Sequence, residues 1–155
     1  MLDLDRFRQA QDAPRAGYAV ALRELQAGEK TGHWIWYVFP QLAGLGRSST
    51  VVYYGLAGVE EAVAYLRDRV LGERLVTVAA AVQAHLSGAS ARPVRLATLM
   101  GSEIDALKLV SSMARFGHVA KTLQFAAMAA HADAILAAAA AQGYARCAYT
   151  EAQLR

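Results

Sequence analysis

Apolar side chains recur every three or four residues through most of the chain, which is the spacing that places them on one face of an α-helix. The pattern predicts helices over residues 3–11, 17–26 and 58–67, and a long helix over 71–86. It also predicts a short helix over 94–100, a longer one that starts at Ser102, and a last one over 123–142. Because the pattern contains no internal repeat and no domain boundary, we expect one compact all-α domain of five to seven helices over residues 1–155.

The helical pattern fails between residues 31 and 58. Four large aromatic side chains fall within positions 34–39, and Pro40 restrains the backbone around it. Residues 42–50 have the glycines and hydroxyls of a loop, whereas residues 51–54 have the local preferences of a strand. An isolated strand finds no partner in the rest of the pattern. We therefore expect an ordered aromatic loop that packs against the helices.

The helix that starts at Ser102 has two faces of different chemistry, and the Ser102 hydroxyl is a suitable N-cap for it. The expected core face consists of Ile104, Leu107, Val110 and Ala114. The opposite face consists of Asp105, Lys108, Ser112 and Arg115. This polar face either lies in solvent, with Asp105 and Lys108 as a modest surface ion pair, or turns inward and supplies an acid, a cation and hydroxyls to a pocket beside the aromatic loop.

The charge of the chain narrows the set of partners only slightly. The net charge is +3 and the pI is about 9.2, from 13 arginines and three lysines among 16 basic residues. These residues are spread along the chain, whereas nucleic-acid-binding domains concentrate them in a patch or stripe. The distribution therefore argues against nucleic-acid binding, although it is compatible with a small anionic ligand.

Several other classes of protein fit the sequence poorly. The single cysteine excludes an internal disulfide and a cysteine-based zinc site, and the four histidines lack the close spacing of metal ligands. No stretch of 18 apolar residues occurs, and the acidic start is unlike a signal peptide. We therefore expect a cytoplasmic protein with no membrane span and no dedicated metal site.

The aromatic loop contains the first candidates for chemistry. His33 can exchange protons near neutral pH, and Glu24 could orient it, although a lone histidine beside tryptophans is commonly a structural residue. Trp34 or Trp36 could stack on a flat ligand, such as a base or a nicotinamide. The alternative is that these rings only fill the core, since aromatic side chains bury a large apolar area.

The loop over residues 44–50 is a second, weaker candidate. Its glycines, Arg47 and hydroxyls such as that of Ser48 are suited to holding a phosphate or carboxylate group. The loop has neither the lysine spacing of a Walker motif nor the strand-turn-helix setting of a dinucleotide fingerprint. The alternative is an ordinary solvated loop.

Taken together, short motifs along nearly the whole chain resemble the bacterial and fungal family called domain of unknown function 1810. The most specific motif is His33-Trp34, Trp36 and Phe39-Pro40-Gln41. The others are Asp5-Arg6-Phe7, Ala10-Gln11, Tyr18, Ala21-Leu22, Glu24-Leu25, Gly28, Lys30, Leu45-Gly46, Ser48, Tyr54-Gly55, Glu61-Ala62, Tyr65-Leu66, Leu71-Gly72, Arg74-Leu75, Asp105, Lys108-Leu109, Ser111-Ser112-Met113 and Phe116. The sequence departs from the family pattern beyond Phe116, where residues 143–147 replace a glycine-aspartate ending.

The resemblance implies an all-α domain with an uncharacterised role. The label calpastatin, which some members bear, does not suit a globular chain, because a calpain inhibitor of that kind is a disordered repeat protein. The family's polar and aromatic motif residues are types that a simple core would not require together. Their presence favours one pocket between the aromatic loop and the later helix.

The leading hypothesis is a small enzyme or binding protein for a nucleotide-like, ADP-ribose-like or other small anionic ligand, with no cofactor assigned. In this hypothesis Trp34 or Trp36 stacks on the ligand. Its negative charge is held by Lys30, Arg47 and Lys108, with Ser48 beside them. His33 or Asp105 moves a proton, while Gln41 and Ser112 fix the orientation. The alternatives are a non-catalytic interaction domain, expected to be a homodimer, and, as a third choice, a nucleic-acid binder.

Overall fold

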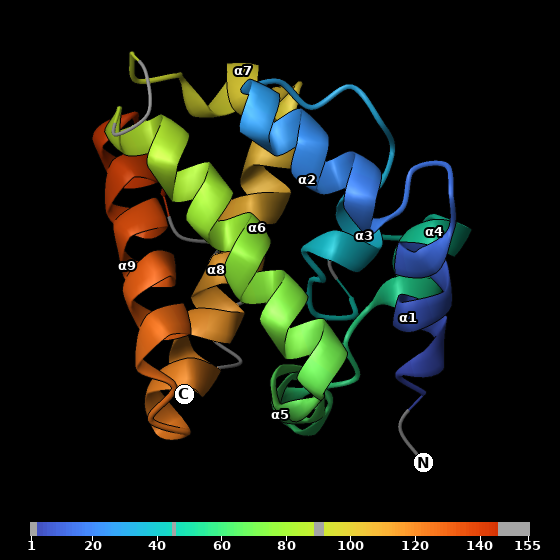
Figure 1. Ribbon diagram of the computed structural model, residues 1–155. Helices are drawn as coiled ribbons and strands as arrows, with labels where there is room; N and C mark the ends of the chain where they lie inside the picture. Colours follow the sequence, from blue (N-terminus) through green and yellow to red (C-terminus); the bar gives the residue numbers. More distant parts are fainter. Residues whose placement is uncertain (1–2, 45, 89–91, 146–155) are drawn as a thin grey trace.

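The computed structural model describes residues 3–44, 46–88 and 92–145, and in these residues it contains nine helices and no strand (Figure 1). The helices are α1 (Asp5–Asp12), α2 (Tyr18–Ala27), α3 (Ile35–Val38), α4 (Ser49–Tyr54), α5 (Val59–Arg67), α6 (Arg69–Ser87), α7 (Leu96–Met100), α8 (Glu103–Thr122) and α9 (Ala126–Ala141). The prediction of an all-α fold is therefore confirmed.

The expected count of five to seven helices was too low, because the aromatic segment contains two short helices, α3 and α4. Residues with strand preferences lie in α4, where the Ser48 hydroxyl accepts a hydrogen bond from the Val51 amide at 3.2 Å and caps the helix. The segment closes on itself through one parallel bridge between Leu42 and Leu56. Local capping and this closure provide the backbone hydrogen bonds that an unpartnered strand could not obtain.

The longest helices form the centre of the molecule. Figure 1 shows α6 running diagonally, with α9 along one of its sides and the region of α1, α3 and α4 on the other. Helices α6 and α8 both pack against α9. The core contains Leu75 and Val82 of α6, Leu109 of α8 and Ile135 of α9, each at most 1% exposed. At Gly117 of α8, a Cβ would lie only 2.9 Å from the Cβ of Ala132 in α9, so the glycine permits this close packing.

The orientation of α8 differs from the expected one. Ile104 and Leu107 were expected in the core, but they are 66% and 52% exposed. Val110 and Ala114 are buried as expected, and so are Ser112 and Arg115 of the polar face, which are 0% and 1% exposed. The polar face of α8 therefore turns inward, and the first turns of the helix present apolar side chains to solvent.

A buried ion pair fixes the position of α4 relative to α1 and α5. Arg6 of α1 meets the Glu61 carboxylate of α5 at 2.6 Å, and both side chains are less than 10% exposed. The same guanidinium donates hydrogen bonds to the carbonyls of Tyr53 at 2.8 Å and Gly55 at 3.1 Å. A buried charge pair of this kind is stable only when its remaining hydrogen-bonding groups are also satisfied, so it holds the end of α4 in place.

Candidate polar-aromatic site

Lys30 lies at the centre of a cluster that joins the aromatic segment to α8. Its ammonium meets the Asp105 carboxylate at 2.6 Å and donates a hydrogen bond to the Gly32 carbonyl, also at 2.6 Å. It also lies 5.0 Å from the centre of the Trp34 ring, within the range of a cation–π contact. The side chain is only 5% exposed. The ion pair with Asp105 therefore provides a physical reason for the inward turn of this face of α8.

Glu24 organises the backbone on the other side of Lys30. One oxygen of its carboxylate accepts hydrogen bonds from the Thr31 amide at 2.9 Å, the Gly32 amide at 2.8 Å and the Trp34 indole N–H at 2.9 Å. Burial alone would raise the pKa of Glu24, but these hydrogen bonds to the carboxylate outweigh that effect and lower the pKa. Glu24 is therefore held ionised and fixes the turn that positions Lys30 and Trp34.

Lys108 is the second cation of the cluster. Its ammonium is 3.9 Å from the other oxygen of the Asp105 carboxylate and 5.2 Å from the centre of the Trp36 ring. The first distance is that of an ion pair but is too long for a hydrogen bond. Asp105 therefore bonds directly to Lys30, while the donors of Lys108 stay available. We call Lys30, Trp34, Trp36, Asp105, Lys108 and Ser112 the polar-aromatic site.

Two buried donors of this site have no hydrogen-bond partner among the described residues. They are the indole N–H of Trp36 and the hydroxyl of Ser112. Buried polar groups in native proteins nearly always have a partner, which is protein, ordered water or a bound molecule. The Trp36 N–H therefore has unused hydrogen-bonding capacity near the Lys108 cation, which suits a group rich in acceptor oxygens.

The space beside Trp36 is small. A cavity of about 10 Å³ lies between α3, α4 and the bridge, and it is lined by Trp36, Gln41, Leu42, Val51, Tyr54 and Gly55. That volume is close to what one water molecule requires. The cavity therefore does not enclose a nucleotide-sized ligand, and only a small group could enter it.

The structure brings together only part of the predicted site. Lys30, Trp34, Trp36, Asp105 and Lys108 are linked by the contacts above, and Ser112 is buried one turn beyond Lys108 on α8. Trp34 is 0% exposed and its N–H is used by Glu24, so it has no free ring face for a ligand to stack on.

The other predicted residues lie around this cluster. The His33 side chain is exposed, and the Glu24 oxygen that was expected to orient it binds Trp34 and the backbone instead. Gln41 is half-buried and lines the small cavity. Arg47 and Ser48 are exposed, and the Ser48 hydroxyl is used as the cap of α4. The anion loop over residues 44–50 includes residue 45, which lies outside the described residues.

Sequence reasoning missed the role of Glu24 as the residue that shapes the turn. Its spacing to Trp34 contains no recognisable motif, because the contact depends on the reversal after α2. Gly28 makes that reversal in the left-handed conformation, with φ at +89°, and its amide hydrogen bonds to the Leu25 carbonyl at 3.1 Å. In the sequence, the only indication of this chain reversal was the glycine that follows an apolar helix.

The described residues lack two further features. Within residues 3–44, 46–88 and 92–145, no group of three or more histidine, cysteine or acidic side chains is arranged to hold a metal ion. In the same parts of the chain, no helix combines the length and the apolar character that crossing a membrane requires.

Comparison with known proteins gives a family but no activity. A family model described as a protein of unknown function, DUF1810, matches residues 1–144. A crystal structure of a conserved hypothetical protein from Mycobacterium tuberculosis is 37% identical, with a TM-score of 0.79. The match covers 97% of this chain and 94% of that one. No curated protein matches the chain.

Proposed function

We propose that this chain, which belongs to the DUF1810 family, binds a small anionic molecule at the polar-aromatic site. The proposal rests on hydrogen-bond donors of this site that have no acceptor among the described residues. The Lys108 ammonium is beyond hydrogen-bond distance of Asp105, and the Trp36 N–H and Ser112 hydroxyl are buried without partners among the described residues. A carboxylate or phosphate group would supply acceptor oxygens to Lys108 and Trp36.

The charges of the site favour an anion at Lys108. Lys30 and Lys108 contribute two positive charges, and Asp105 and the ionised Glu24 contribute two negative charges. Asp105 lies 2.6 Å from Lys30 but 3.9 Å from Lys108, so Lys108 is the less neutralised of the two cations. The side chains of Lys108 and Asp105 are only 21% and 17% exposed, and interactions between charges are stronger in such surroundings than at an exposed surface.

The size of the cavity limits how the ligand binds. A space of about 10 Å³ beside Trp36 holds one water-sized atom, such as a single acceptor oxygen, and not a whole phosphate or carboxylate group. In our proposal one oxygen of the anionic group enters this space, while the rest of the group meets Lys108 outside it and the remainder of the ligand lies against the half-exposed side of Trp36. A nucleotide-like or ADP-ribose-like compound would therefore bind through one phosphate oxygen, with Gln41 at the wall of the cavity.

The same geometry changes the roles we assign to the proton carriers. Asp105 is shared by two lysines and acts in this proposal as a positioning residue that holds both cations. His33 is exposed and lies next to Trp34 in the chain, so its side chain can contact only the outer part of a ligand. Binding, rather than proton transfer, is the function that the contacts support best.

A thermal-shift screen tests the proposal directly. Inorganic phosphate, ribose 5-phosphate, AMP and ADP-ribose would be added to the wild type, to Lys108→Ala and to His33→Ala. A ligand that binds the native state raises the melting temperature. We expect at least one compound to stabilise the wild type and His33→Ala but not Lys108→Ala.

The matched control is Lys121→Ala, because Lys121 lies on the same helix, is 58% exposed and pairs with Asp133 at 2.9 Å, far along α8 from the site. It removes the same charge without touching the site, so it should keep the full ligand response. If no compound shifts the wild type, or if Lys108→Ala and Lys121→Ala respond alike, the proposal is wrong.

A second function, self-association, is favoured by one observation. Ile104 and Leu107 are exposed on the same helix as Lys108, and large exposed apolar side chains mark interaction surfaces when they form a patch. In this alternative the protein is a homodimer that buries both residues. Light scattering on the wild type and on the double variant Ile104→Ser, Leu107→Ser tests it. A dimeric wild type and a monomeric variant would support it, and a monomeric wild type would exclude it.

A further inference from the structure

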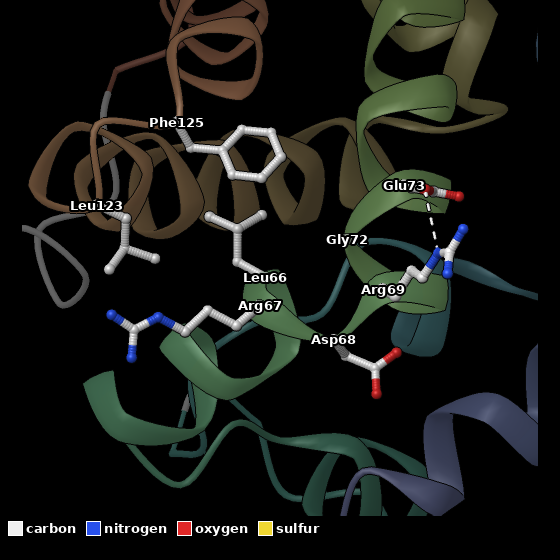
Figure 2. Close-up of a pocket in the computed structure, with 8 residues that line it drawn as sticks. All are labelled: Leu66, Arg67, Asp68, Arg69, Gly72, Glu73, Leu123 and Phe125. Carbon is white, nitrogen blue, oxygen red and sulfur yellow. Dashed lines mark ion pairs between the residues drawn. The ribbon is translucent and has the colours of Figure 1, made fainter.

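A second concave site lies away from the polar-aromatic site, where the junction of α5 and α6 faces the turn between α8 and α9. The cavity has a volume of about 320 Å³ and is open to solvent. Its apolar lining comes from Leu66, Leu123 and Phe125 (Figure 2). Sites for small molecules commonly have volumes of 300–1,000 Å³ with mostly apolar linings. This cavity is therefore large enough to hold one aromatic ring system.

The base of the cavity is a tight junction between helices. A Cβ at Gly72 of α6 would lie 2.3 Å from the carbonyl oxygen of Leu66, so only glycine allows α6 to start this close to the end of α5. Asp68 accepts hydrogen bonds from the amides of Val70 and Leu71 and pairs with Arg8 of α1. The start of α6 is therefore already capped, and the base of the site is closed and rigid.

Phe125 is held toward the cavity by its backbone. The preceding residue, Gln124, has φ at +58°, which is rare for a residue other than glycine. The Phe125 amide is fixed by a hydrogen bond to the Ala120 carbonyl at 2.7 Å. Phe125 is nevertheless 37% exposed. The turn thus presents an aromatic face to the cavity, opposite Leu66 (Figure 2).

The cations at the rim differ in their availability. Arg69 lies 4.0 Å from Glu73, so its charge is partly offset. Arg67 is exposed, lines the same cavity, and has no ion-pair or hydrogen-bond partner among the described residues. Figure 2 shows the two arginines extending to opposite sides of Leu66. Arg67 is therefore the group best able to bind an anion beside the apolar lining.

We propose that this cavity binds a small aromatic anion, a carboxylate or a phosphate monoester, with its ring against Phe125 and Leu66 and its charge on Arg67. The chemistry follows from the lining, since a flat apolar wall favours a ring and an unpaired guanidinium favours a bidentate anion. This site shares no residue with the polar-aromatic site, so each proposal can fail without the other.

The test is an NMR titration of the ¹⁵N-labelled full chain with 1-naphthoate. Its matched probes are 1-naphthalenemethanol, which has the same ring without the charge, and inorganic phosphate, which has charge without the ring. We expect 1-naphthoate to shift the amide signals of Gly72, Leu123 and Phe125. Arg67→Ala and Phe125→Ala should each weaken its affinity several-fold, up to about ten-fold, as the loss of one charge-assisted contact or one aromatic contact implies.

Arg23→Ala is the control variant, because Arg23 is exposed on α2 and its loss changes the net charge equally. It should bind 1-naphthoate as the wild type does. The proposal is overturned if these amides do not shift, if the neutral alcohol binds as tightly, or if Arg67→Ala and Arg23→Ala weaken binding equally.

Discussion

At the scale of single residues, one carboxylate oxygen determines much of the candidate site. Glu24 accepts three hydrogen bonds within 3 Å, two from the backbone and one from Trp34. A glutamine in place of Glu24 would have a weaker acceptor oxygen and an NH₂ group without a suitable partner. The turn that positions Lys30 would then lose its main anchor.

We predict that Glu24→Gln lowers the free energy of unfolding by about 1–3 kcal/mol, the range expected for hydrogen bonds to a charged group. Urea unfolding followed by circular dichroism measures the change. The matched control is Glu29→Gln, because the side chain of Glu29 is exposed and has no hydrogen bond or ion pair with the described residues. Equal effects of the two substitutions would contradict the role we assign to Glu24.

The lowered pKa of Glu24 also predicts a dependence on pH. Because the pKa of Glu24 is lower in the folded state than in the unfolded state, the folded protein holds this proton less tightly. The resulting stabilisation is complete above the ordinary pKa of a glutamate and is lost as the pH falls through the folded-state value.

The free energy of unfolding measured at a series of pH values should therefore fall less steeply in acid for Glu24→Gln than for the wild type. Asp68, whose pKa is also lowered by its bonds to Arg8 and the start of α6 despite its partial burial, contributes to the remaining slope of both proteins. Parallel curves for the two proteins would show that Glu24 is not responsible.

The residue types of the site could be selected from the sequence, but their contacts could not. Glu24 and His33 were paired because a carboxylate can orient a histidine, whereas the turn after Gly28 places the Trp34 N–H on that carboxylate. Trp34 and Trp36 have equal aromatic character in the sequence, and only the burial shows that Trp36 alone keeps a partly exposed ring.

At the scale of elements, α8 shows where periodicity is insufficient. The apolar and the polar residues of α8 both recur at helical spacing. The pattern therefore predicts a helix correctly but does not determine which face of it is buried. Asp105 of α8 forms its buried ion pair with Lys30, which lies 75 positions earlier in the chain. No local window of sequence contains that contact, and the assignment of Ile104 and Leu107 to the core was therefore wrong.

Leu107 and Leu109, on different faces of α8, should respond differently to truncation. Leu107→Ala should change the free energy of unfolding by less than about 0.5 kcal/mol, as is usual for exposed positions. Leu109→Ala, two residues further along α8, should cost about 2–5 kcal/mol, because its side chain is fully buried. Chemical denaturation of both variants measures this. A large loss for Leu107→Ala would mean that its side chain is buried, as it would be in a dimer.

At the scale of the whole molecule, the helical fold was predictable and its connections were not. The long helices follow from apolar spacing, and their glycine and serine caps were readable, as Ser102 at the start of α8 shows. The short helices α3 and α4 were missed, because four or six residues carry too little periodicity to identify a helix. They are stabilised by contacts with α1, α5 and α8 that only the assembled core provides.

The central claim is that the Trp36 indole N–H is a donor that awaits a ligand acceptor. The most direct measurement is a ¹H–¹⁵N spectrum of the labelled protein, in which the two tryptophans give two indole signals. Glu24→Gln identifies the Trp34 signal, because its partner changes.

Adding the stabilising anion from the thermal-shift screen should move the Trp36 indole signal while that of Trp34 stays in place. The shift should disappear in Lys108→Ala and persist in Lys121→Ala. If the anion leaves the Trp36 indole signal unchanged, or if Lys108→Ala gives the same shift as the wild type, the polar-aromatic site is not the binding site.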